Sequence, residues 1–132
     1  MQIRFLGKET SGGDSPTLYA TDRQTYLIQG YKVTDPEILA KLDIPEGETC
    51  VEIYARLLAH LSKDGLHGVV TSWAPPIVRV MENGNYLVQG PRVTDPAIRA
   101  ELALPDNEDC IEVPREALRA LLEENDRGVD DA

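Results

Sequence analysis

The chain contains one sequence unit twice. Residues 16–61 align without a gap with residues 76–121 at an offset of 60, and 18 of the 46 aligned positions are identical. A unit of this size buries too little surface to be stable alone, so we expect the two copies to share one hydrophobic core. The repeat predicts a single domain over residues 1–122 with internal pseudo-twofold symmetry, built of repeats at about 1–62 and 63–122.

Each repeat has the pattern of a ββαβα unit. Each copy contains a predicted hairpin, in which two segments rich in β-formers flank a polar turn. These segments are residues 17–21 and 25–31 in the first copy and 77–81 and 86–88 in the second, where the turn contains Asn-Gly. Side chains that face the core alternate with side chains that face away from it at residues 49–53 and 109–113, which predicts a third strand in each copy. A leucine-rich helix is predicted after each of these strands. An N-terminal strand at 3–6 has its expected counterpart at 66–70. These patterns predict an α+β fold in which helices cover a mainly antiparallel sheet.

A short helix is predicted between the second and third strands of each copy. Asp35 and Asp95 suit the N-cap, and the proline after each suits the first helical position. Ile38 and Leu42 lie four residues apart, as their counterparts 98 and 102 do, so we expect each pair to form a buried helix face.

The formal net charge is −10, and −4 of it lies in residues 123–132, which we expect to form a disordered acidic tail. An acidic body repels phosphate backbones and anionic lipids, so we expect no direct nucleic-acid binding and no membrane binding. A basic protein partner suits this charge. The alternative is that the charge only keeps the protein soluble.

We expect a cytoplasmic protein without cofactors. The start of the chain lacks the apolar run of a signal peptide, and no stretch approaches the length of a membrane span. Cys50 and Cys110 are expected to be reduced, buried and unreactive, because neighbouring carboxylates oppose thiolate formation. His60 and His67, with cysteines 60 residues apart, give no metal-binding spacing, so no metal site is expected.

The polar residues that recur in both copies are the first candidates for a binding site. Gln29 and Lys32 match Gln89 and Arg92, and they would line two symmetric pockets or one pocket on the pseudo-axis. In the alternative, structural interpretation the glutamines bond loop backbone and the bases are solvated surface charges.

Aromatic residues that break the repeat are the second candidates. Tyr31 and Trp73 have no aromatic counterpart in the other copy, and tyrosine and tryptophan are enriched at binding hot spots. Tyr19 and Tyr54 break the repeat in the same way. The alternative is that these rings pack against the linker between the copies.

Several short motifs, at residues 1–8, 19–22, 29–30, 33–36 and 51–53, give the chain a family resemblance. From Met1 to about Leu122 it resembles small acidic uncharacterised proteins of streptomycetes and related actinobacteria, which are thought to be encoded near helix-turn-helix regulators. The resemblance implies an accessory regulatory role and assigns no site residue.

We therefore expect a non-enzymatic protein-interaction module, an accessory regulatory partner of a DNA-binding or toxin-like protein. The alternative is a small-ligand-binding domain or small enzyme with a site between the two repeats. The sequence leaves open whether the chain forms a homodimer.

Overall fold

The computed structural model describes residues 1–9 and 16–123, with only the backbone of Glu123. It has an α+β fold in which every pairing between described strands is antiparallel. The main sheet follows the order β1-β2-β3-β4-β7-β6, and β8 pairs with β3. Its strands are β1 (Ile3–Lys8), β2 (Thr17–Thr21), β3 (Thr25–Lys32), β4 (Glu48–Ile53), β6 (Ile77–Val80), β7 (Tyr86–Pro91) and β8 (Glu108–Pro114).

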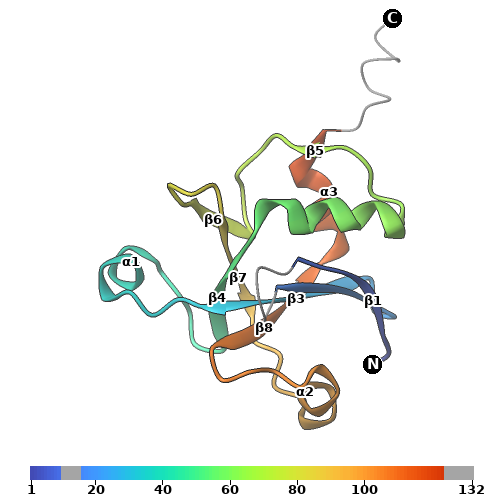
Figure 1. The fold of residues 1–132 in the computed structure, drawn as a ribbon, viewed down its shortest axis with the longest axis horizontal. Coiled ribbons are helices and arrows are strands. Elements are labelled where there is room, and N and C mark those ends of the chain that lie inside the picture. The colour runs from blue at the N-terminus through green and yellow to red at the C-terminus, as the bar shows by residue number, and fades with distance from the viewer. Residues whose placement is uncertain (10–15, 124–132) are drawn as a thin grey trace, which may run out of the picture.

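Four short helices connect or follow these strands. They are α1 (Pro36–Lys41), the 3-10 helix η1 (Ala55–Asp64), α2 (Pro96–Leu102) and α3 (Arg115–Leu121). In Figure 1, η1 and α3 lie together above the sheet, α2 lies below it, and α1 projects at the left. The predicted caps are confirmed, since Asp35 accepts a hydrogen bond from the amide of Glu37 and Asp95 from that of Ala97, both at 2.9 Å.

The longest strand pairings join the first repeat to the second. Strand β3 pairs with β8 from Thr25 to Tyr31, and β4 pairs with β7 along all six residues of both strands. By contrast, β3 and β4 of the first repeat share only the pairs Tyr31–Glu52 and Lys32–Val51. The two longest strand pairings of the sheet therefore depend on both halves of the sequence.

Gly30 lies where β3 runs close to β4. A Cβ atom at this position would lie 2.6 Å from the carbonyl oxygen of Glu52 and 2.8 Å from Cγ2 of Ile53. Only glycine fits such an approach without a shift of backbone, which explains the glycine inside a strand-forming segment.

Most of the buried apolar residues form two clusters, and Leu87 and Cys50 are buried outside them. The larger lies between the sheet, η1 and α3, and includes Tyr26, Ile28, Val51, Leu57 and Leu118. The smaller holds α2 to the sheet, and its buried members are Leu27, Val93, Ile98, Leu102 and Cys110. Ile3 of β1 and Tyr19 of β2 pack against the smaller cluster.

The prediction of a buried α1 face is wrong. Helix α1 has no buried residue, and Ile38 and Leu42 are only half-buried, whereas Ile98 and Leu102 of α2 are buried. The physical reason is a missing strand. Strand β1 lies beside β2, but the expected counterpart of β1 pairs elsewhere: β5 (Val69–Val70) joins β9 (Leu122–Glu123) in a separate sheet.

Among the described residues, no helix is both long enough and apolar enough to cross a membrane. Of the tail that the sequence predicts to be disordered, Glu123 belongs by its backbone to β9, and residues 124–132 lie outside the described residues.

Candidate functional site

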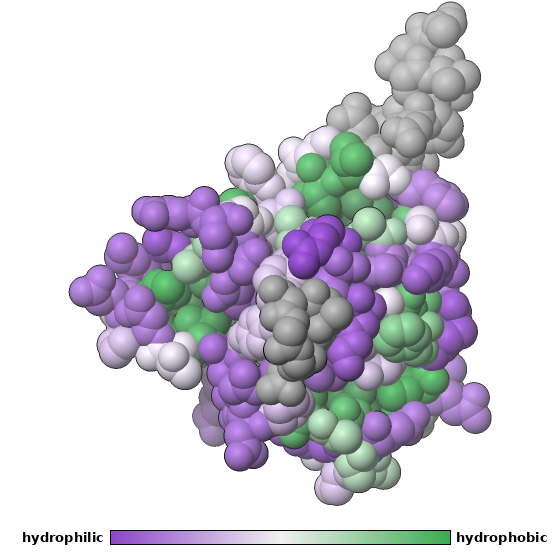
Figure 2. Space-filling view, in the orientation of Figure 1, coloured by the Kyte–Doolittle hydropathy of each residue, from purple (hydrophilic) through white to green (hydrophobic). Residues whose placement is uncertain are grey.

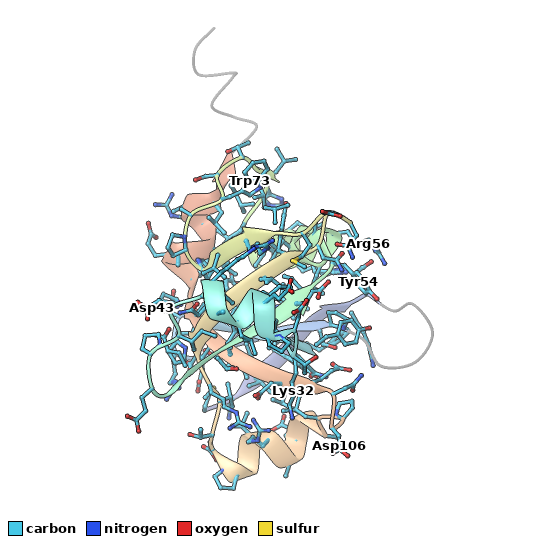
Figure 3. The ribbon with its side chains drawn as sticks, turned by 90° about the vertical axis from the view of Figure 1, so that its left-hand side faces the viewer. Lys32, Asp43, Tyr54, Arg56, Trp73 and Asp106 are labelled. Carbon is cyan, nitrogen blue, oxygen red and sulfur yellow. The ribbon has the colours of Figure 1, made fainter. Side chains whose placement is uncertain are left out.

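A groove separates α1 from β6 and the turn after it. Its volume is about 440 Å³, and its walls are Asp35, Glu37, Ile38 and Lys41 on one side and Arg79, Val80, Met81, Glu82 and Asn83 on the other. Figure 3 looks onto this side of the molecule, with α1 in front of the strands. We call this feature the α1 groove.

The α1 groove has three apolar lining residues, and the other six, which are charged or polar, form its rim. Of the apolar residues, Ile38 and Met81 are half-buried, and Val80 of β6 keeps 38% of its surface exposed. In Figure 2, hydrophobic side chains over α1 are surrounded by hydrophilic ones. The rim carries three carboxylates and two bases among the lining residues, so it is mildly acidic.

One wall of the α1 groove is a free strand edge. Strand β6 ends the path of the main sheet, and no described strand pairs with its outer edge. The amide of Met81 donates to the carbonyl of Asn85 at 2.8 Å, toward β7. Because successive residues of a strand point their backbone groups to opposite sides, the N–H and C=O of Val80 face outward. Among the described residues, this edge therefore has no strand partner.

The two glutamines predicted to bind a ligand form hydrogen bonds within the protein. Gln29 is buried and donates from Nε2 to a carboxylate oxygen of the buried Glu108 at 2.9 Å. Gln89 is half-buried and donates to the carbonyl of Asp43 at 3.0 Å and to the carboxylate of Glu48 at 3.2 Å. The bond to Asp43 is a loop-backbone contact of the kind that the structural interpretation expects.

The two predicted bases lie at the ends of their strands and differ in their contacts. The amide of Lys32 donates to the carbonyl of Asn107, and Lys32 is exposed. Arg92 also uses its amide on a loop carbonyl, but its side chain forms an ion pair with the buried Asp109 at 2.8 Å. Arg99 reaches the same carboxylate at 3.1 Å. Arg92 therefore contributes to burying Asp109.

The structure does not bring the predicted aromatic residues into one patch. The hydroxyls of Tyr31 and Tyr54 lie 3.2 Å apart, and the Arg56 guanidinium lies 4.6 Å from the centre of the Tyr54 ring. Trp73 is 67% exposed. It lies at the top of Figure 3, well away from Tyr54, Arg56 and Lys32.

Both cysteines are buried and form no disulfide. Burial raises the pKa of the Cys50 thiol to about 12, and the nearby Glu52 carboxylate adds to this rise. Burial and then the neighbouring Asp109 raise the pKa of Cys110 as well. Within the described residues, no three His, Cys, Asp or Glu side chains gather as metal ligands would.

No sequence pattern predicted the residues of the α1 groove as a site. The helices of both copies share the same cap and the same apolar spacing, although the repeat itself carries the signal of a difference. Tyr19, which packs against the smaller cluster, is matched by the charged Arg79. This exchange of an apolar residue for a charged one marks a face that is covered in one copy and uncovered in the other.

Comparison with protein-family models, with curated proteins and with solved structures finds no match to this chain.

Proposed function

We propose that this protein is a non-enzymatic interaction module that binds a basic protein, as an accessory regulatory partner of a DNA-binding or toxin-like protein. The observation that carries the proposal is the α1 groove, in which three apolar residues and a mildly acidic rim lie beside a strand edge that no described strand pairs with. Exposed apolar patches with polar rims are typical of protein-binding sites. The net charge of −10 favours encounter with a positively charged partner.

We also propose that the two repeats are structurally equivalent halves related by a pseudo-twofold axis. Strand registers support this idea, because Gln29 pairs with Cys110 and the equivalent Gln89 pairs with Cys50. Two backbone hydrogen bonds support it in the same way: the amide of Lys32 donates to the carbonyl of Asn107, and that of Arg92 to the carbonyl of Gly47. The uncovered α1 face is then a local departure from this symmetry.

Affinity capture followed by surface plasmon resonance tests the proposed function. The captured protein should be basic, and its association rate should fall as salt rises, because the Debye length shrinks from about 10 Å at 0.1 M to about 3 Å at 1 M. The variants Tyr31→Ala and Trp73→Ala are measured against the same captured protein, and a faster dissociation rate of either variant identifies its ring as a binding residue. Binding that is indifferent to salt would contradict a partner selected by charge.

A specific observation favours one alternative, a small-ligand site between the repeats. A second groove, of about 300 Å³, is lined by prolines and valines of the second repeat together with Gln89, and the first repeat contributes Glu48. Mostly apolar walls with few polar groups are typical of ligand pockets. A metabolite that co-purifies with the native protein and is lost from Gln89→Ala would support this alternative.

A further inference from the structure

We infer that the α1 groove and the free edge of β6 bind an extended basic segment of the partner protein, which adds to the sheet as a strand antiparallel to β6. The inference rests on the proposed function and specifies its site and mode of binding. Addition of a strand to an exposed sheet edge is a recurring mode of peptide recognition, with backbone hydrogen bonds supplying affinity and side-chain pockets supplying specificity.

The equivalent face of the first copy indicates which kind of segment fits beside β6. Strands β2 and β6 occupy equivalent positions, because Tyr19 pairs with Leu27 and, 60 residues later, Arg79 pairs with Leu87. On its other edge β2 carries β1, and Ile3 of β1 packs against the cluster that buries α2. Strand β6 carries no described strand there, and α1 has no buried residue. One extended segment beside β6 would complete the second face as β1 completes the first.

The register of β1 predicts the chemistry of the bound segment. In β1, Ile3 lies opposite Thr21, Arg4 opposite Ala20, and Phe5 opposite Tyr19. Transferred by the offset of 60, an aliphatic residue would lie opposite Met81 and reach Ile38 in the groove. An aromatic residue would lie opposite Arg79, where a cation–π contact is available.

Charge selects a basic segment over a second copy of this chain. The groove rim has more carboxylates than bases, and the whole chain is strongly acidic, so two copies repel each other. Residues 2–8, which include all of β1, carry two bases, Arg4 and Lys8, and no acid. They therefore have both the apolar pattern and the charge that the face requires.

The test uses a capped synthetic peptide with the sequence of residues 2–8, titrated into the isotope-labelled full chain and followed by NMR. We expect saturable shifts on the amides of β6 and α1. Ile38→Lys, which charges the groove, and Val80→Pro, which removes the outward amide of β6, should each weaken binding by roughly tenfold or more. Shifts that are absent, unsaturable or spread over other surfaces would overturn the inference.

Two controls separate a site-specific effect from charge or misfolding. Val69→Lys adds the same charge at an exposed valine of β5 outside the groove, and it should bind within about twofold of the unmodified chain. Ile38 lies on a helix without buried residues, so the Ile38→Lys variant should melt close to the temperature of the unmodified chain. It therefore remains a valid test even if the Val80→Pro variant is unfolded.

The outcomes also distinguish this inference from the proposed function. If a basic partner binds with salt dependence but Ile38→Lys and Val80→Pro bind it equally well, the site is wrong and the function stands. If neither the peptide nor any basic protein binds, both are wrong. If sedimentation shows a dimer of the chain that Val80→Pro dissociates, the occupant is a second copy and the basic segment is overturned.

Discussion

At the scale of single residues, the two repeat-equivalent glycines differ in how tightly they are enclosed. A Cβ atom on Gly30 would meet backbone of β4 at 2.6 Å, whereas one on Gly90 would meet the Cγ1 atom of Val113 at 3.1 Å. A backbone carbonyl in a strand pair cannot move aside, but a valine methyl group can shift by a few tenths of an ångström.

We therefore expect Gly30→Ala to lower the free energy of unfolding by about 1–3 kcal/mol, as overpacking does, and Gly90→Ala to cost clearly less. Urea denaturation of both variants against the unmodified protein measures the difference. Equal costs at the two positions would show that the close approach at Gly30 is not what limits the side chain.

Asp64 is the charged residue that ties η1 to three other elements. Burial opposes its ionisation, but hydrogen bonds from Tyr26, Arg115 and Arg4 outweigh this and hold its pKa below the ordinary 3.8. Tyr26, which is fully buried, donates its hydroxyl hydrogen at 2.6 Å. A carboxylate whose pKa is lowered by folding stabilises the fold above its unfolded pKa, and that contribution is lost as pH falls through the folded pKa.

Asp64→Asn should therefore destabilise the protein at pH 7, and the difference from the unmodified protein should narrow as pH falls below about 4. Denaturant melts over this pH range measure it. Glu116→Gln is the control, because Glu116 pairs with Arg119 on the surface and should have a smaller effect. A pH-independent difference would assign the role of Asp64 to packing.

The cysteines give a chemical prediction at the same scale. Because both thiols are buried and their pKa values are raised, neither should react with a thiol reagent in the native state at pH 7. Two equivalents should react once the protein is unfolded. Rapid labelling of native protein would mean that the region around β4 or β8 opens readily.

At the scale of elements, α1 and α2 have the same cap and different packing. Each begins with an Asp-Pro cap, but Ile98 and Leu102 bury α2 while α1 has no buried residue. Loss of a cap can lower global stability only if the helix is coupled to the core, and otherwise it frays the helix locally.

Asp95→Ala should therefore cost about 0.5–2 kcal/mol of global stability. Asp35→Ala should leave the melt nearly unchanged while speeding amide exchange within α1. Paired denaturation and hydrogen-exchange measurements test this contrast. A large global loss in Asp35→Ala would show that α1 is held to the core more firmly than its burial indicates.

At the scale of the whole molecule, the strand registers make the two repeats interdependent. The pairs β3–β8 and β4–β7 join the halves, and within the first repeat β3 and β4 share only two residue pairs. Either half alone would leave the edges that form these two pairs without their partners.

We predict that a fragment of residues 1–65 has no cooperative unfolding transition, and we expect the full chain to unfold in one step. Circular dichroism melts of the fragment and of the full chain test this. A fragment that melts cooperatively as a monomer would show that the first repeat is an independent domain.

The sequence by itself determined the local structure. Asp-Pro at 35–36 and 95–96, the Asn-Gly turn and the alternating strands are signals that act within a few residues, and the elements appear where those signals place them. Mainly antiparallel strands and buried cysteines also followed from these patterns.

Only the tertiary structure decided which strands pair and which helix face stays open. Residues 66–70 resemble the N-terminal strand, yet Val69 and Val70 pair with β9 rather than β6. The choice depends on contacts between segments far apart in the chain, which a local pattern does not encode. The groove beside α1 lies where the second copy has no counterpart of β1, and Ile38, which lines it, therefore looks like an ordinary core position in the sequence.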